Sequence, residues 1–277
     1  MHALRPLFSA LVSGWILAAC STVHMPSFMD SVQWQQHLST ASLPAILLLG
    51  EQHDAPEHQQ WQLATIQGLI KRQQLGAVVL EMADHGYDTQ GLAATATESE
   101  VQQTLKWNDE GWPWKAYGPS VMAAVRAGVP IFGGNLPRMQ MKEVMHQTLW
   151  DSHLPATAWD RQRDAIRSGH CDLLPEHQIA PMARIQLAKD ARMAQTATSL
   201  LQPAKTVVLI AGRGHVLRSI GIPTWLPAHV HATIAIGQAG GKPQSVPQDS
   251  DFIVRTPAVP EKDHCTALKA QWNQLKK

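Results

Sequence analysis

Short, continuous apolar runs separated by stretches with helical periodicity restrict what this chain can fold into. The clearest runs are residues 45–49 (A-I-L-L-L) and 206–211 (T-V-V-L-I-A), and each is followed by a glycine. Runs that are apolar at every position are typical of strands covered on both faces. We therefore expect an α/β fold, with a mostly parallel β-sheet flanked by helices on both faces. The expected strands cover residues 45–49, 77–82, 129–132, 206–211 and 231–236, with a sixth candidate at 252–255; the expected helices cover 57–74, 119–127 and 176–201.

The start of the chain has the pattern of a bacterial lipoprotein signal. Arg5 precedes a short stretch of apolar and small residues, 7–17, which is too short to span a bilayer as a helix. Small residues then lead to Cys20, the expected site of diacylation. We expect removal of residues 1–19, a lipidated tether over residues 20–44, and a location at the periplasmic face of the outer membrane, because no acidic residue directly follows the cysteine. The alternative is an ordinary secretory signal with an incidental cysteine.

The composition is that of one folded domain with an ample core. Hydrophobic residues make up 44% of the chain and charged residues 16%, so residues 45–277 are expected to form a single α/β domain. The net charge of +1 gives no reason to expect a nucleic-acid partner. In an oxidising compartment Cys171 and Cys265 can pair; two unconnected thiols are the alternative, and their spacing alone does not decide between them.

Polar side chains with catalytic or metal-binding chemistry lie at the ends of three expected strands. The first strand leads into Gly50-Glu51-Gln52-His53, the second contains Glu81, and the fourth leads into Gly212-Arg213-Gly214-His215. In open α/β sheets, ligands bind beyond the carboxyl ends of the strands. If these strands are neighbours, the two carboxylates and two imidazoles converge, and they suit either a divalent metal or general acid–base chemistry. For each residue alone, a hydrogen-bonded polar side chain without catalytic function is the alternative.

A second group of candidate residues is aromatic. Residues 107–117 (W-N-D-E-G-W-P-W-K-A-Y) contain three indoles and Tyr117, which together could frame a flat ligand. A phenolate oxygen suits ferric haem iron. Farther along, Arg184, Lys189 and Arg192 could hold carboxylates such as propionates. The alternatives are a helix entry that packs on the core and a solvated charged face.

Taken in order, these segments resemble the ChaN-like haem-binding uptake lipoproteins. The expected lipid anchor agrees independently with that resemblance. The matching segments cover most of the chain after the leader: I-L-L-L-G-E-Q-H-D (46–54), V-V-L-E-M (78–82), W-P-W-K-A-Y (112–117), G-V-P-I-F-G-G-N-L-P-R (128–138), G-H-C-x-L-L-P-E (169–176), Q-L-A-K-D-A-R-M-A (186–194) and V-V-L-I-A-G-R-G-H-V-L-R-S-I-G-I-P (207–223).

The resemblance implies a role in haem or iron uptake. It implies that a tyrosine ligates ferric haem at the interface of a homodimer, where a histidine of the second subunit contacts propionates. The chain has two tyrosines, and the surrounding indoles favour Tyr117 over its rival Tyr87. Arg213 and Lys189 depart from the family pattern, which bears on the charge of the pocket. The candidate haem-binding residues are Tyr117, Tyr87, His53, His215, Trp112 and Trp114.

The same strand-end motifs also resemble a wider group that includes erythromycin-esterase-like hydrolases and metal-dependent membrane proteases. That resemblance implies a different class of function, a metal-dependent hydrolase that uses Glu51, His53, Glu81 and His215. Two further hypotheses stay open: an inherited active site beside a separate haem site, and a scaffold without a small ligand.

Overall fold

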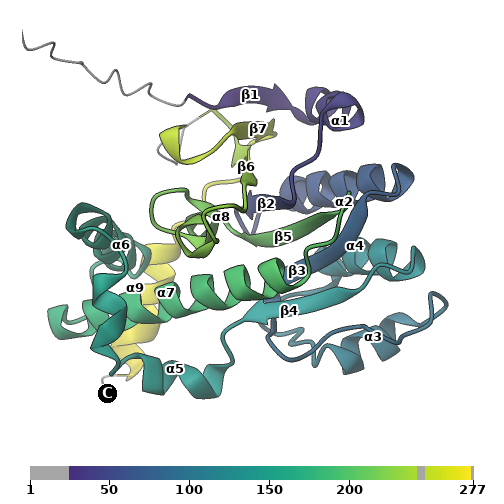
Figure 1. The fold of residues 1–277 in the computed structure, drawn as a ribbon. Coiled ribbons are helices and arrows are strands. Elements are labelled where there is room, and N and C mark those ends of the chain that lie inside the picture. Colours follow the sequence, from purple (N-terminus) through teal and green to yellow (C-terminus); the bar gives the residue numbers. More distant parts are fainter. Residues whose placement is uncertain (1–24, 242–246, 276–277) are drawn as a thin grey trace, which may run out of the picture.

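The computed structural model describes residues 25–241 and 247–275, and a single seven-stranded parallel sheet organises them (Figure 1). The expected leader and Cys20 lie outside the described residues. The strands are β1 (Ser27–Asp30), β2 (Ile46–Glu51), β3 (Leu75–Asp84), β4 (Ile131–Asn135), β5 (Thr206–Gly212), β6 (Ala232–Ala239) and β7 (Phe252–Thr256), in the spatial order β1-β7-β6-β2-β5-β3-β4. The α-helices are α1 (Ser31–Thr40), α2 (Pro56–Lys71), α3 (Glu98–Thr104), α4 (Trp114–Arg126), α5 (Arg138–Val144), α6 (Ala156–Gly169), α7 (Glu176–Ser199), α8 (Arg213–Val216) and α9 (His264–Leu275).

The predicted fold class is confirmed, because helices cover both faces of the parallel sheet. Along β2, Ile46 and Leu48 belong to a core that includes residues of α7, whereas Leu47 and Leu49 belong to a core with α1, α2 and α4. Figure 1 shows α7 crossing in front of the sheet, with α2 and α4 side by side behind it. Burial on both faces explains why β2 reads as a continuous apolar run.

The expected strands correspond to β2 to β7, but two details differ from the expectations. Residues 27–40, within the expected tether, form β1 and α1 instead of an unpatterned lead-in. Asp30 caps α1 in a capping box with Gln33, and the indole of Trp34 donates to Thr65 Oγ1 of α2 at 2.8 Å. The helix expected from residue 119 begins earlier, at Trp114, and contains Pro119 within it.

The strands that carry the polar motifs are adjacent at the centre of the sheet. β5 lies between β2 and β3, and Glu51 at the end of β2 pairs in register with Gly212 at the end of β5. The three strands that were expected to be neighbours are therefore neighbours in the sheet. The carboxyl ends of parallel strands meet at one edge, which brings β2, β5 and β3 together there.

Two further expectations concern covalent linkage and the membrane. Cys171, after α6, and Cys265, in α9, form a disulfide, so the pairing that the sequence left open is present. This bond ties the C-terminal helix to the turn between α6 and α7. Among residues 25–241 and 247–275, no helix combines the length and apolarity needed to cross a bilayer.

Candidate functional site

Glu51 is a buried carboxylate held by four donors at the end of β2. Its Oε1 atom accepts from the Tyr117 hydroxyl at 2.6 Å and lies 2.7 Å from His53 Nδ1. Its Oε2 atom accepts from the side-chain amides of Gln59 at 3.0 Å and Gln62 at 2.7 Å, both on α2. Glu51 is 1% exposed, so it is shielded from water. The four donors supply the hydrogen bonds that water would give to an exposed carboxylate.

His53 is the exposed member of this network. Donation from its Nδ1–H to Glu51 leaves Nε2 as the proton acceptor of the neutral ring. Burial lowers the pKa of His53, but the hydrogen bond to Glu51 and the charges of Glu81 and Glu51 outweigh it and raise the pKa above 6.5. Glycine at position 212 leaves space for this ring, because a Cβ there would lie 2.8 Å from His53 Nε2 and the imidazole would have to shift. The β5 end thus leaves room for this imidazole.

A second, deeper network joins β3, α7 and α8. His215 Nδ1 lies 2.5 Å from Asp190 Oδ1, and His215 Nε2 lies 3.2 Å from Glu81 Oε1. Glu81 Oε2 also accepts from the Gly212 amide at 2.8 Å, and the Lys189 ammonium is 4.0 Å from Oε1. Burial lowers the pKa of His215, but its two carboxylate partners outweigh burial and raise that pKa to about 10. His215 is therefore a charged imidazolium at neutral pH.

The two carboxylates beside His215 are affected in opposite directions. Burial raises the pKa of Glu81, but the charge and hydrogen bond of His215 outweigh it and place the pKa well below the usual range. Burial raises the pKa of Asp190 to about 6. Carboxylates and imidazoles with divergent pKa values are the arrangement that general acid–base chemistry requires. Clusters of this kind are also found at structural ion pairs.

The strand-end residues are not gathered as a metal cage. In the described part of the chain, one group of three side chains has potential metal-ligating atoms within 4.8 Å of one another. Its members are Cys171, His264 and Cys265. Two of those residues are joined in the disulfide. The divalent-metal alternative for the strand-end residues stays a prediction.

The aromatic segment lies directly over the Glu51 network. Trp112 contacts the His53 ring edge-on, with centroids 4.8 Å apart, and also contacts Tyr117. Trp114 donates from its indole to Glu98 at 2.8 Å and packs edge-on against Trp107. Tyr117 is 3% exposed, and burial, followed by the charge of Glu51, raises its pKa well above 10. Its phenol is a neutral donor inside the core.

Tyr87 has the opposite environment. It lies in the loop after β3 and is 40% exposed. The backbone of the loop is fixed, because Tyr87 accepts from the Gly133 amide of β4 and donates its own amide to Asp84. Two residues earlier, His85 contacts Thr196 of α7 through Nδ1 at 3.1 Å. The phenol of Tyr87 is accessible from solvent on an anchored loop.

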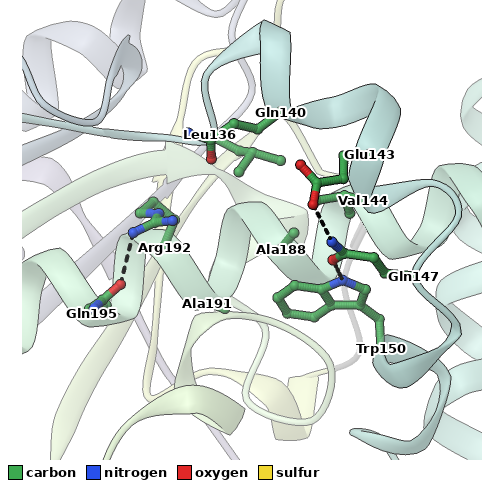
Figure 2. Close-up of a pocket in the computed structure, with 10 residues that line it drawn as sticks. All are labelled: Leu136, Gln140, Glu143, Val144, Gln147, Trp150, Ala188, Ala191, Arg192 and Gln195. Carbon is green, nitrogen blue, oxygen red and sulfur yellow. Dashed lines mark hydrogen bonds between the residues drawn. The ribbon is translucent and has the colours of Figure 1, made fainter.

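A surface recess of about 270 Å³ lies between α5 and α7 (Figure 2). Leu136, Val144 and the Trp150 ring supply apolar walls, and Arg192 enters from α7, where it donates to Gln195. The charge of Arg192 also acts on His85, after burial, to lower the pKa of that histidine. Arg192 thus lines the recess and acts electrostatically on His85, two residues before Tyr87 in the sequence. Of the other cations, Arg184 is engaged by both oxygens of Asp151.

Sequence reasoning overlooked several members of the strand-end networks. Asp190 completes the His215 contacts, and Gln59 and Gln62 hold Glu51. A signal for Asp190 was present, because it precedes the buried Met193 by three residues on the apolar face of α7. An acidic residue at such a position needs a buried partner.

Comparison with known proteins identifies a family. A family profile described as "Haem-binding uptake, Tiki superfamily, ChaN" matches residues 38–226. No curated protein matches the chain. A solved structure titled "Cofacial heme binding to ChaN of Campylobacter jejuni" has a TM-score of 0.63 at 23% identity, covering 81% of this chain and 94% of that one. The type III effector HopBA1 matches at 14% identity with a TM-score of 0.46, over 88% of this chain and 100% of that one.

Proposed function

From the finding that this chain belongs to the haem-binding uptake family ChaN, of the Tiki superfamily, we propose that it binds haem in haem or iron uptake. Tyr87 is the proposed iron ligand. When bound, haem would supply a ferric iron that a phenol oxygen can ligate. The residues that hold it must therefore offer an accessible phenol.

The exposure of the two tyrosines is the observation that carries this choice. Tyr87 is 40% exposed, whereas Tyr117 is 3% exposed and its hydroxyl is committed to Glu51. A porphyrin is broad and rigid, so its iron reaches a phenol oxygen only where the protein leaves room for the ring around that oxygen. Binding through Tyr117 would require Trp112 and the Glu51 network to rearrange first.

Arg192 and the recess that it lines offer chemistry for the other parts of a haem. The Arg192 guanidinium suits a propionate, and the recess beside it has apolar walls. Met139 on α5 is 94% exposed and Leu149 is 66% exposed, and each is next in sequence to a residue that lines the recess. A recess of about 270 Å³ encloses only part of a macrocycle, and we extend the proposal to a homodimer that covers the remainder.

The lipid anchor is a separate part of the proposal. Cys20 follows a short apolar stretch and small residues, the pattern of a lipidated cysteine. Diacylation at Cys20 would hold the domain at the periplasmic face of the outer membrane. Mass spectrometry of the protein purified from membranes tests this, and an unmodified Cys20 contradicts it.

Hemin titration of the folded protein tests the ligand assignment. The wild type is expected to give a Soret band with tyrosinate character, and Tyr87→Phe is expected to weaken binding at least tenfold. Tyr117→Phe is the matched control, and its hemin affinity should stay within twofold of wild type. Loss of binding in Tyr117→Phe alone contradicts the choice of Tyr87, and failure of the wild type to bind hemin contradicts the proposed function.

The Glu51–His53 contact supports a second candidate function, a hydrolase. An imidazole held by a buried carboxylate, with Nε2 left as acceptor, is suited to deprotonate water. A divalent ion on the strand-end residues is the metal-dependent version of this candidate. Glu51→Gln should abolish hydrolysis of an ester panel, and elemental analysis of the same sample separates the two versions. A wild type inactive on ester and peptide panels rules out this candidate.

A further inference from the structure

A second cavity, separate from the recess beside Arg192, lies between the first halves of α2 and α4. Its volume is about 480 Å³, within the range of roughly 300–1,000 Å³ typical of small-molecule sites. His53, in the connection between β2 and α2, is one of its lining residues. Neither the haem proposal nor the deeper His215 network uses this cavity.

The walls of the cavity are largely apolar. Three prolines and two aliphatic side chains supply most of that surface, and none of them offers a side-chain hydrogen bond. An apolar ligand body therefore gains by leaving water here. The apolar lining residues are Pro56, Leu63, Pro113, Ala116 and Pro119.

The rim of the cavity is cationic. Lys115 from the start of α4 and Lys262 from the segment before α9 both line it. Lys262 lies 3.5 Å from Asp54, the one carboxylate among the lining residues, and is still 70% exposed. Lys115 forms no ion pair with any residue that the structure describes. One carboxylate against two ammonium groups leaves a net positive rim.

We propose that this cavity binds an amphipathic carboxylate, with the apolar chain between α2 and α4 and the carboxylate at Lys115 and Lys262. An apolar interior with a cationic rim is complementary to a ligand with an apolar chain and a negative end. It does not suit a neutral polar ligand, and the rim repels a cation. A free fatty acid of medium chain length is the occupant that best matches a cavity of this size. The site places the ligand beside His53, but binding does not depend on catalysis or on haem.

Isothermal titration calorimetry of the folded protein with decanoate tests the proposal. Decanoate is expected to bind one to one, and decyltrimethylammonium, which has the same chain and the opposite charge, at least tenfold more weakly. Ala116→Phe fills the cavity and should weaken decanoate binding at least tenfold. Absence of decanoate binding, or equal affinity for the cation, overturns the proposal.

Charge variants keep the test decisive if Ala116→Phe fails to fold. The double variant Lys115→Gln/Lys262→Gln should weaken decanoate binding at least fivefold without weakening the binding of decyltrimethylammonium. Lys106→Gln/Lys142→Gln changes the net charge equally at exposed positions elsewhere, and decanoate affinity should be unchanged. Equal losses in both double variants overturn the assigned rim, because the effect is then general electrostatics.

Hemin competition separates this site from the haem proposal. Saturating hemin should leave the decanoate affinity of the wild type within twofold, since the two ligands occupy different places. Displacement of decanoate by hemin in both the wild type and Tyr87→Phe overturns the inference of a separate carboxylate site. Failure of hemin to bind at all leaves the decanoate result standing, so the two proposals fail independently.

Discussion

The hydroxyl of Tyr117 donates a 2.6 Å hydrogen bond to Glu51 Oε1, the same oxygen that His53 Nδ1 contacts. Phenol and imidazole therefore share one acceptor. Removing the phenol in Tyr117→Phe leaves Glu51 more available to His53, so the pKa of His53 should rise further, as measured by NMR titration of its ring protons. Loss of a hydrogen bond to a buried charge should also lower the unfolding free energy by about 1.5–3 kcal/mol.

The exposed tyrosine supplies the control for that prediction. Tyr87→Phe removes the same hydroxyl from a 40% exposed ring outside the Glu51 network, so stability should change by no more than about 0.5 kcal/mol. The pKa of His53 should be unaffected. If the two variants move the His53 pKa equally, the effect does not pass through Glu51.

Gly212 is expected to be intolerant of even one added carbon. A Cβ at position 212 would lie 2.8 Å from His53 Nε2 and 3.5 Å from Glu81 Oε2, so Gly212→Ala must displace the imidazole. We expect a loss of about 1–3 kcal/mol in urea unfolding, the usual cost of overpacking. Gly214→Ala is the matched control, because its Cβ meets nothing within 4 Å, and it should be neutral or slightly stabilising.

Much of the fold was predictable because its strands are buried on both faces. The continuous runs that became β2, β3 and β5 had one reasonable interpretation, and their parallel order followed from the helices between them. β1 was not predictable, since its four residues are mostly exposed and carry no run. It is fixed by pairing with β7, a contact distant in sequence.

The candidate site was predictable at the strand ends and less so away from them. Glu51 ends β2, and Glu81 and His215 lie within three residues of the ends of β3 and β5, so the sheet topology brings all three to one edge. Asp190 comes from the middle of α7, and its partner is set by how that helix crosses the sheet. The exposures of Tyr87 and Tyr117 depend on packing that no local pattern encodes. The indoles around Tyr117 favoured it as the haem ligand, but Trp107 and Trp112 pack with it against the core.

His215→Gln should be among the most destabilising single substitutions in the chain. It leaves Glu81 and Asp190 buried without their shared imidazolium, and breaking a buried ion pair costs about 3–5 kcal/mol. The control is His177→Gln at an exposed position on α7. Urea denaturation at pH 7 measures both, and similar stabilities would contradict an ionised network.

The raised pKa of His215 also predicts a pH dependence. Its folded-state pKa of about 10 exceeds the ordinary 6.5, so its contribution to stability is complete below 6.5 and is lost as pH rises to 10. His215→Gln should therefore lose less stability than wild type between pH 7 and pH 10. Equal losses in the two proteins would show that His215 is neutral in the fold.

His58 should produce a dependence of the opposite sign in acid. Burial lowers its pKa to about 4, and its Nδ1 accepts from the Gln52 amide at 2.9 Å. Between pH 6.5 and 4 the unfolded chain binds a proton that the folded chain does not. The unfolding free energy should therefore decrease by up to about 3 kcal/mol as the pH is lowered over this range. His58→Asn should flatten this slope in urea titrations, and His229→Asn, at an exposed position, should not.

The disulfide between Cys171 and Cys265 should contribute to stability through the chain it closes. It joins residues 94 apart, and closing a loop of about 100 residues restricts the unfolded state by roughly 4–5 kcal/mol in the chain-entropy description. The double variant Cys171→Ser/Cys265→Ser should lower the unfolding free energy by about 3–5 kcal/mol. Dithiothreitol should destabilise the wild type by a similar amount and leave the double variant unchanged. A reductant effect that persists in the double variant would place the sensitivity elsewhere than in the bond between the α6–α7 turn and α9.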